Sequence, residues 1–198
     1  MIEVHPLSGP DAARHVDAVA ALRIAVFRDW PYLYEGDFDY EAKYLATYAA
    51  SAESLFVLAF DGTRIVGAST GIPLAHETAA FVDPFSARGI PSEDVFYFGE
   101  SVLLPEYRGQ GLGHRFFDER ERYARRLGRF RMTAFCAVER DADDPRRPPG
   151  HRSNDAFWSR RGYRRQDDMF CSIDWPEVGG GMALSHRLRF WLRPLDPA

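Results

Sequence analysis

The chain has 198 residues, of which 45% are hydrophobic and 27% are charged, and its formal net charge is −4. This composition is typical of a globular protein and argues against a disordered or collagen-like chain. The negative net charge disfavours a broad electrostatic attraction to nucleic acid or to an anionic membrane surface.

The cysteine content and the chain ends give little sign of secretion or of a metal site. Cys136 and Cys171 both lie in apolar runs, and neither belongs to a Cys-x-x-Cys pair or a Cys/His cluster. We therefore expect no disulfide framework and no bound metal. No leader pattern is visible at the start, and no apolar run reaches the roughly 20 residues that span a bilayer. The expected compartment is the cytoplasm, with neither a membrane nor a nucleic acid as partner.

Apolar patterns in the first part of the chain predict two helices and then a strand pair. The expected order is a strand at 2–7, a helix that ends at Trp30-Pro31, an irregular aromatic and acidic segment at 30–40, a helix at about 40–50, and strands at 55–60 and 64–68. The strand at 55–60 is apolar without alternation, which predicts that both of its faces are covered. The Asp61-Gly62 pair between the two strands is typical of a β-hairpin.

The second part of the chain alternates between strands and helices. The expected order is an excursion at 75–94, a strand at 95–104, a glycine-rich loop at 105–113, an amphipathic helix, a strand at 130–138, a charged loop at 141–152, a short helix at 154–161, and strands at 166–175 and 186–192. Strands and helices mixed around one sheet predict an α/β or α+β fold. No linker divides the chain, so we expect a single domain over residues 1–198.

The glycine-rich loop carries the strongest functional signal. A strand leads into it and a helix follows, so its backbone N–H groups are expected at a helix N-terminus, where they bind phosphate oxygens. Gly109, Gly111 and Gly113 let the backbone approach a ligand closely, and Arg108 can add a charge-assisted contact. These features together predict an anion site in the loop.

Two common phosphate loops match this segment poorly. The spacing of its glycines differs from the Gly-x-Gly-x-x-Gly fingerprint of dinucleotide-binding folds, and the loop lies in the middle of the chain, although Glu139 could serve as the acid of such a fold. The Gly-Lys-Ser/Thr sequence of a P-loop is absent.

The pattern Arg108-x-x-Gly111-x-Gly113 after an apolar strand resembles the acetyl-CoA-binding motif of the GCN5-related N-acetyltransferases, the GNAT family. The segment from Asn154 to Tyr163 is similar to the second motif of that family, a short helix that ends in Gly-Phe or Gly-Tyr. The resemblance covers residues 51–175. It implies one acyltransferase-like domain with a mixed, mostly antiparallel sheet that is flanked by helices and has splayed central strands, at 95–104 and 130–138.

The resemblance also implies acetyl-CoA as a cosubstrate, with its pyrophosphate on the loop amides and its pantetheine arm between the splayed strands. The implied binding residues are Val102, Leu103, Leu104, Arg108, Gly109, Gln110, Gly111, Leu112, Gly113, Asn154 and Phe157. Phe157 also fits the role of an ordinary core residue of the short helix.

The implied reaction is an N-acetyl transfer, in which a primary amine attacks the thioester directly. The amine must lose a proton to a base, and the carbonyl oxygen needs a fixed donor, for which a backbone N–H of the splayed strand is expected. Glu100 is the expected catalytic base, because a carboxylate in an apolar strand is costly unless it is paired or functional. Glu35 and Asp37 are the alternatives. Trp158 departs from the family pattern, which often has an acidic tyrosine at that position to protonate the leaving thiolate.

The acceptor and the oligomeric state stay open. The segment at 30–40 has aromatic rings and carboxylates that could bind a cationic acceptor. The same residues could instead form a packed aromatic lid with its carboxylates on the surface. A small-molecule amine, a peptide amine and a homodimer are all compatible with the sequence. Two other functions compete with the acetyltransferase. One is a non-catalytic acyl-CoA sensor, which the Trp158 departure favours, and the other is a dinucleotide-dependent oxidoreductase.

Overall fold

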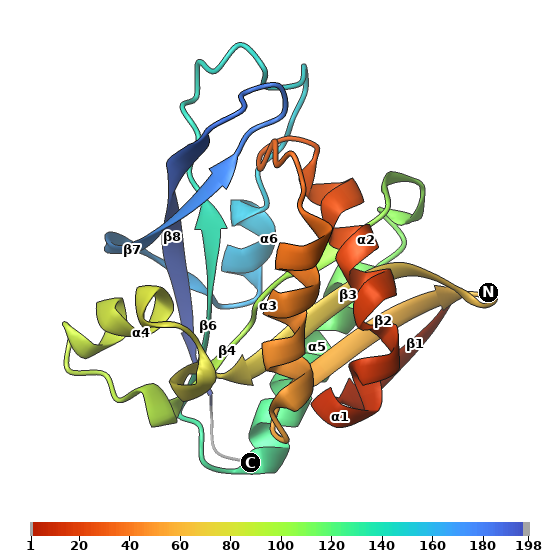
Figure 1. The fold of residues 1–198 in the computed structure, drawn as a ribbon. Helices are drawn as coiled ribbons and strands as arrows, with labels where there is room; N and C mark the ends of the chain where they lie inside the picture. The colour runs from red at the N-terminus through yellow and green to blue at the C-terminus, as the bar shows by residue number, and fades with distance from the viewer. Residues whose placement is uncertain (1, 196–198) are drawn as a thin grey trace.

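The computed structural model describes residues 2–195, in which one sheet runs through the middle of the molecule (Figure 1). Within these residues the strand order is β1-β2-β3-β4-β6-β8-β7, and β5 pairs with β3 outside this path. The bounds are β1 (Ile2–Ser8), β2 (Leu55–Asp61), β3 (Arg64–Pro73), β4 (Val95–Tyr97), β5 (Ser101–Leu103), β6 (Met132–Val138), β7 (Arg164–Pro176) and β8 (Ala183–Pro194). Only β4 and β6 are parallel neighbours, which confirms the mixed, mostly antiparallel sheet.

Helices cover both faces of the sheet (Figure 1). The helices are α1 (Gly9–Ala12), α2 (Val16–Phe27), α3 (Phe38–Ala50), α4 (Ala79–Ser86), α5 (Leu112–Leu127) and α6 (Asp155–Arg160). Short 3-10 turns occur at Ala13–His15, Leu74–His76, Ser92–Asp94 and Pro105–Tyr107. α2, α3 and α4 pack on one face, whereas α5 and α6 pack on the other. None of the helices in this part of the chain is long and apolar enough to cross a membrane.

The strand β2 shows why the sheet needs cover on both faces. Phe56 and Leu58 point into the core beneath α2 and α3, whereas Leu55 and Val57 point into the core beneath α5. This alternation inside an uninterrupted apolar run confirms the prediction of a strand covered on both faces. The hairpin after it is also confirmed, although Asp61 still pairs with Arg64, so the turn is made by residues 62–63.

The predicted strand at 95–104 is not continuous, and this correction matters for the site. β4 pairs with both β3 and β6, whereas β5 pairs with β3 alone among the strands of residues 2–195. Between them, the Phe98 N–H donates to the Ala134 carbonyl at 2.8 Å, whereas the Gly99 N–H donates to the Thr70 carbonyl at 3.2 Å. The chain thus stays beside β3 throughout and loses its pairing with β6 at residues 98–100. Beyond this break β5 and β6 are not paired, as expected for splayed strands.

Other boundaries differ by a few residues. α3 begins at Phe38, inside the segment predicted to be irregular, because the Asp37 carboxylate accepts the Tyr40 N–H at 2.9 Å and caps the helix. The last two strands are longer than predicted, since β8 is paired along its length with both β6 and β7.

Candidate active site

The glycine-rich loop forms the N-terminus of α5 and leaves its amides free. Gly109 and Gly111 have left-handed backbones, with φ of 77° and 79°, and no atom lies within 4 Å of where a methyl group would stand on either residue. The Arg115 N–H is the first of the helix to find an acceptor, the Gly111 carbonyl at 3.2 Å. Within residues 2–195, the N–H groups of residues 109–114 have no acceptor. Such a group of free amides at a helix N-terminus suits an anion.

Side chains around the loop anchor it to the sheet. The Arg108 Nε donates to the Leu103 carbonyl at 3.1 Å, and the Gln110 side chain donates to the Glu106 carbonyl at 3.4 Å. Both side chains are exposed, whereas Leu112 is buried and ties the first turn of α5 to the core. Arg108 therefore has a structural contact in addition to a position beside the free amides.

The edge of β5 that faces away from β3 has no strand partner within residues 2–195, although its Leu103 carbonyl accepts the Arg108 Nε. Glu100 accepts the Thr70 N–H at 3.2 Å, and the Leu104 N–H donates to Val66 at 3.0 Å, so these two residues turn their backbone groups toward β3. Because backbone direction alternates along a strand, Val102 also faces β3, whereas Ser101 and Leu103 face the gap beside β6. Of the predicted contacts Val102, Leu103 and Leu104, only Leu103 turns its backbone groups toward the gap, and Ser101, which was not predicted, does so as well. The Val102 side chain packs in the core.

Residues of the second motif lie beside the loop. Asn154 is exposed at the start of α6, and its side chain makes no hydrogen bond within residues 2–195. Phe157 packs against His114 and Phe117, with ring centroids 4.9 and 5.5 Å apart, and lies 3.8 Å from where a methyl group on Gly113 would stand. Phe157 is therefore both a core residue and a neighbour of the loop.

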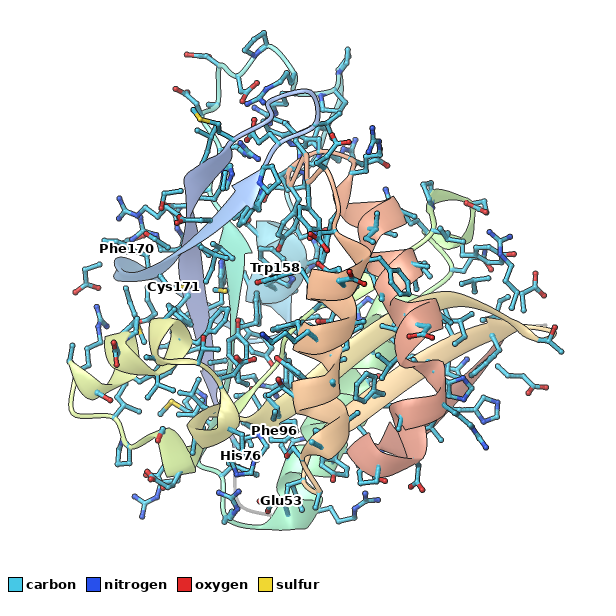
Figure 2. All side chains as sticks on the ribbon, in the orientation of Figure 1. Glu53, His76, Phe96, Trp158, Phe170 and Cys171 are labelled. Atoms are coloured by element: carbon cyan, nitrogen blue, oxygen red, sulfur yellow. The ribbon has the colours of Figure 1, made fainter. Side chains whose placement is uncertain are left out.

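Trp158 of α6, labelled in Figure 2, packs against two aromatic rings. Its ring centroid lies 5.0 Å from that of Phe135 and 5.2 Å from that of Trp191, and its indole N–H has no acceptor among the described residues. The nearby Tyr163 is no substitute acid, because its hydroxyl is buried against Thr133 at 2.9 Å and burial raises its pKa. The environment of Trp158 therefore fits a packing residue.

Glu100 lies at the strand break, and its side chain is 2% exposed. Arg23 of α2 reaches it from the helix layer and donates to one Glu100 oxygen, while its Nε donates to Glu41 of α3. The other oxygen, Oε1, is buried and has no hydrogen-bond partner among residues 2–195. Burial raises the pKa of the Glu100 carboxyl, and the charge of Arg23 opposes that rise. A carboxylate held through one oxygen and free at the other is suited to accept a proton.

A second buried arginine stabilises the strand break from the opposite face. Arg120 of α5 donates to the Glu100 carbonyl at 3.1 Å, to the Thr70 carbonyl at 3.3 Å and to the Ser101 hydroxyl at 2.8 Å. Its guanidinium lies 4.2 Å from the Phe98 ring centroid, and burial lowers its pKa to about 10. Arg120 thus links the helix that follows the glycine-rich loop to the residues around Glu100.

The two alternative acids have structural partners. Asp37 caps α3, and Glu35 accepts the Gly179 N–H at 3.2 Å and pairs with Arg28 at 3.4 Å. Both therefore hold the segment at 30–40 in place. Neither is part of the strand break, so the geometry favours Glu100.

The aromatic segment before α3 packs against the last hairpin. The Trp175 indole N–H donates to the Tyr32 carbonyl at 3.1 Å, and Arg140 donates to the carbonyls of Pro31 and Tyr32 at 2.6 and 2.7 Å. Tyr34 is buried. These contacts support the alternative of a packed lid for this part of the segment.

Sequence reasoning missed the partners of Glu100. Arg23 is the only charged residue between positions 18 and 27 of an apolar helix, and this signal could have marked it as a buried ion-pair partner. Glu41 and Arg120 lie in helices rich in charged residues, where nothing distinguishes them from solvated side chains.

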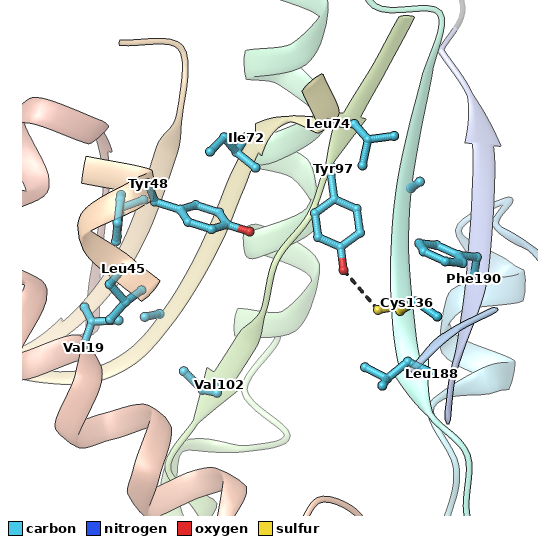
Figure 3. Close-up of a cluster of buried hydrophobic side chains, with 14 of the residues drawn as sticks. Val19, Leu45, Tyr48, Ile72, Leu74, Tyr97, Val102, Cys136, Leu188 and Phe190 are labelled. Atoms are coloured by element: carbon cyan, nitrogen blue, oxygen red, sulfur yellow. Dashed lines mark hydrogen bonds between the residues drawn. The ribbon is translucent and has the colours of Figure 1, made fainter. Parts of the chain in front are cut away.

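The buried cysteines show no metal or disulfide chemistry. Cys136 and Cys171 are free thiols, and the Cys136 sulfur lies 3.0 Å from the Tyr97 hydroxyl (Figure 3). No group of His, Cys, Asp and Glu within residues 2–195 has an arrangement that could hold a metal ion. Burial raises the pKa of the Cys136 thiol, which makes it a poor nucleophile.

Several solved structures share this fold. An N-acetyltransferase of Staphylococcus aureus Mu50 aligns with a TM-score of 0.62 at 10% identity, covering 99% of both chains. The protein yncA of Salmonella typhimurium, solved with its cofactor acetyl-CoA, aligns at 0.58 with 13% identity over 100% of this chain and 96% of its own. The PaiA N-acetyltransferase of Thermoplasma acidophilum, in complex with coenzyme A, aligns at 0.55 with 12% identity over 98% and 99%.

At the level of sequence, no curated protein matches the chain significantly. The sequence model of the acetyltransferase (GNAT) family matches residues 20–148, which include the glycine-rich loop, Arg23 and Glu100. This match covers more than half of the chain and agrees with the splayed strands and the free loop amides. The chain therefore belongs to the acetyltransferase (GNAT) family.

Proposed function

We propose that this protein is an acetyl-CoA-dependent N-acetyltransferase that acetylates a primary amine, with Glu100 as its catalytic base. The observation that carries the proposal is that a buried carboxylate with one unpartnered oxygen, a strand edge without a strand partner and free amides follow one another along residues 100–114. The complexes of two structural neighbours with acetyl-CoA and coenzyme A support it.

The residues present fit acetyl-CoA. The loop amides suit its pyrophosphate, and the space beside Gly109 and Gly111 allows close approach. The Ser101 backbone groups and the Leu103 N–H, which face the gap, suit the amides of its pantetheine arm, as an added strand would be bound. The unpaired Asn154 side chain offers a further hydrogen bond.

The protein groups supply the remaining steps of the transfer. The bound acetyl-CoA provides an acetyl thioester, whose C–S bond breaks as the acceptor nitrogen forms the new C–N bond and the CoA thiol is released. Glu100 takes one proton from the acceptor ammonium on its free oxygen, while Arg23 fixes the other oxygen. A second proton passes from the nitrogen of the tetrahedral intermediate to the leaving sulfur, which departs as the thiol. A backbone N–H on the open edge of β5 is the fixed donor for the carbonyl oxygen.

Thermal melting with separate ligands tests the cosubstrate. A ligand at a concentration of 100 times its Kd should stabilise the folded state by about 2.7 kcal/mol. We expect acetyl-CoA to raise the melting temperature and NADPH to leave it unchanged. A shift with NADPH alone would overturn the proposal in favour of an oxidoreductase.

We expect Gly111→Val to weaken acetyl-CoA binding at least about tenfold, or about 1.4 kcal/mol. The valine side chain would occupy the open space beside the loop amides, and its backbone would be strained at φ 79°. Gly128→Val is the matched control, because Gly128 caps the other end of α5 with φ 74° and equally open surroundings. Calorimetric titration of both variants measures the Kd, and equal affinities would contradict the assignment of the loop.

We expect Trp158→Phe to leave kcat within about threefold of the wild-type value while it lowers stability by about 0.5–3 kcal/mol. The reason is that the indole only packs against Phe135 and Trp191. Steady-state thiol release and urea unfolding measure the two effects. A large fall in kcat in a stable variant would show that the indole has a specific role in the reaction.

A further inference from the structure

A second carboxylate, Glu77, lies near the strand break and has no cationic partner. Glu77 follows the turn after β3 and is half-buried. One of its oxygens accepts the Tyr48 hydroxyl, and the other accepts the Thr78 N–H at 3.1 Å. Within residues 2–195, no arginine, lysine or histidine forms an ion pair with it. An ionised carboxylate in such a place is costly unless a cation joins it.

Tyr48 connects Glu77 to the neighbourhood of Glu100. A methyl group on Gly99 would stand 2.6 Å from the Tyr48 hydroxyl, so this hydroxyl lies directly against the residue before Glu100. The Tyr44 hydroxyl is 2.9 Å from the Tyr48 hydroxyl. Figure 3 shows Tyr48 reaching from α3 toward Tyr97 of β4. Tyr48 therefore bonds to Glu77 and lies against the backbone beside Glu100.

The charges of this region do not balance. Glu41, Glu77 and Glu100 are three carboxylates, and the Arg23 guanidinium pairs with only two of them. Arg120 adds a second positive charge, although its hydrogen bonds go to carbonyls and to the Ser101 hydroxyl, so three carboxylates face two guanidinium groups. Independently of Glu77, the Oε1 atom of Glu100 is buried without a partner. Buried charges are normally paired, so the region lacks positive charge that a ligand can supply.

Aromatic rings in the same region already accept a cation. The Arg23 guanidinium lies 4.8 Å from the ring centroid of Tyr44 and 4.9 Å from that of Phe27. Phenol rings beside a carboxylate suit an alkylammonium group, through cation–π attraction and charge pairing.

On the basis of the proposed acetyltransferase function, we infer that the acceptor is a primary amine that carries a second ammonium group, which Glu77 binds beside Tyr44 and Tyr48. The first nitrogen of this acceptor lies at Glu100 and receives the acetyl group. The second ammonium stays charged and supplies the missing counter-ion. Burial raises the pKa of Glu77, and binding of a cation would keep its carboxylate ionised.

A series of α,ω-diamines of increasing length, each compared with the n-alkylamine of the same length, tests this inference. Thiol release with acetyl-CoA gives kcat/KM for each amine. We expect the best diamine to exceed its matched monoamine at least about tenfold in the wild-type protein. Glu77→Gln should bring the ratio of kcat/KM between the diamine and its matched monoamine close to one. Glu53→Gln is the control, since Glu53 is already paired with Arg129 at 2.7 Å and should leave both values unchanged.

A binding measurement separates failure of this inference from failure of the proposed function. Calorimetric titration of the best diamine into the protein saturated with coenzyme A reports the ammonium site without acetyl transfer. Binding that is lost in Glu77→Gln supports the site even if no amine is acetylated, in which case only the proposed reaction fails. Equal turnover of diamine and monoamine in the wild-type protein, or an equal effect of Glu77→Gln on both, would overturn the inference while the acetyltransferase function stands.

Discussion

Replacing Glu100 with glutamine should lower kcat by about 10²–10⁴-fold, the usual contribution of a general base, while acetyl-CoA still binds. The amide cannot take the proton of the acceptor, but it keeps the size of the side chain at the strand break. Glu41→Gln is the matched control, because it removes the other carboxylate on Arg23, with the same 2% side-chain exposure. We expect its kcat to stay within about tenfold of the wild-type value. Near-normal turnover of a folded Glu100→Gln variant would show that a different group is the catalytic base.

If Glu100 is the catalytic base, the reaction rate should depend on pH. Glu100 must be ionised to act, and burial raises its pKa above the ordinary value of 4.5, with Arg23 opposing this rise. The carboxyls of Glu41 and Glu77 and the guanidinium of Arg120 also face this region. We therefore expect kcat/KM to fall with decreasing pH through an apparent pKa above 4.5, and this acid limb to be missing from the residual activity of Glu100→Gln. An unchanged acid limb in the variant would assign the titration to another group.

Replacing Arg23 with methionine should destabilise the protein by about 3–5 kcal/mol, because it leaves two buried carboxylates without their cation. Burial lowers the pKa of Arg23, but Glu100 and Glu41 outweigh this and hold it above its ordinary value, which shows how strongly this guanidinium is favoured in its charged form. Urea unfolding at neutral pH measures the loss. A loss below about 1 kcal/mol would mean that the ion pairs contribute no more than exposed ones.

A combined variant separates the charge effect from the loss of packing. Arg23→Met together with Glu41→Gln and Glu100→Gln removes both carboxylate charges along with the guanidinium. We expect this triple variant to be more stable than Arg23→Met alone, since no uncompensated charge remains buried. If the triple variant is equally unstable, the loss comes from the packing of Arg23 over Phe27 and Tyr44 and not from charge.

The glycine-rich loop and the layers of the fold could be predicted because their signals are local. A strand, Arg108 with its following glycines and an amphipathic helix are adjacent in sequence, and free amides at the helix start follow from that order. Glu100 stood out because a carboxylate in an apolar strand needs an explanation.

The surroundings of Glu100 could not be predicted, because they are made by residues far apart in the chain. Arg23 and Glu100 are 77 positions apart, and only the packing of α2 on the sheet brings them together. The strand break was hidden because the residues at 95–104 read as one apolar strand. Gly99 was the available signal, since only a residue without a side chain lets the hydroxyls of Tyr48 and Thr70 approach so closely. The sequence around Glu77 reads as a loop, and nothing in it distinguishes this glutamate from an exposed one.

The most direct test of the account is to incubate the protein with acetyl-CoA and a panel of primary amines and to quantify both products. Free thiol is measured by colour reaction and the N-acetylated amine by mass spectrometry, for the wild-type protein and for Glu100→Gln. The account predicts equal amounts of thiol and acetylated amine in the wild-type reaction, and a strong loss of both in the variant. Tight binding of acetyl-CoA with no acetylated amine from any member of the panel would contradict it and identify the protein as an acyl-CoA sensor.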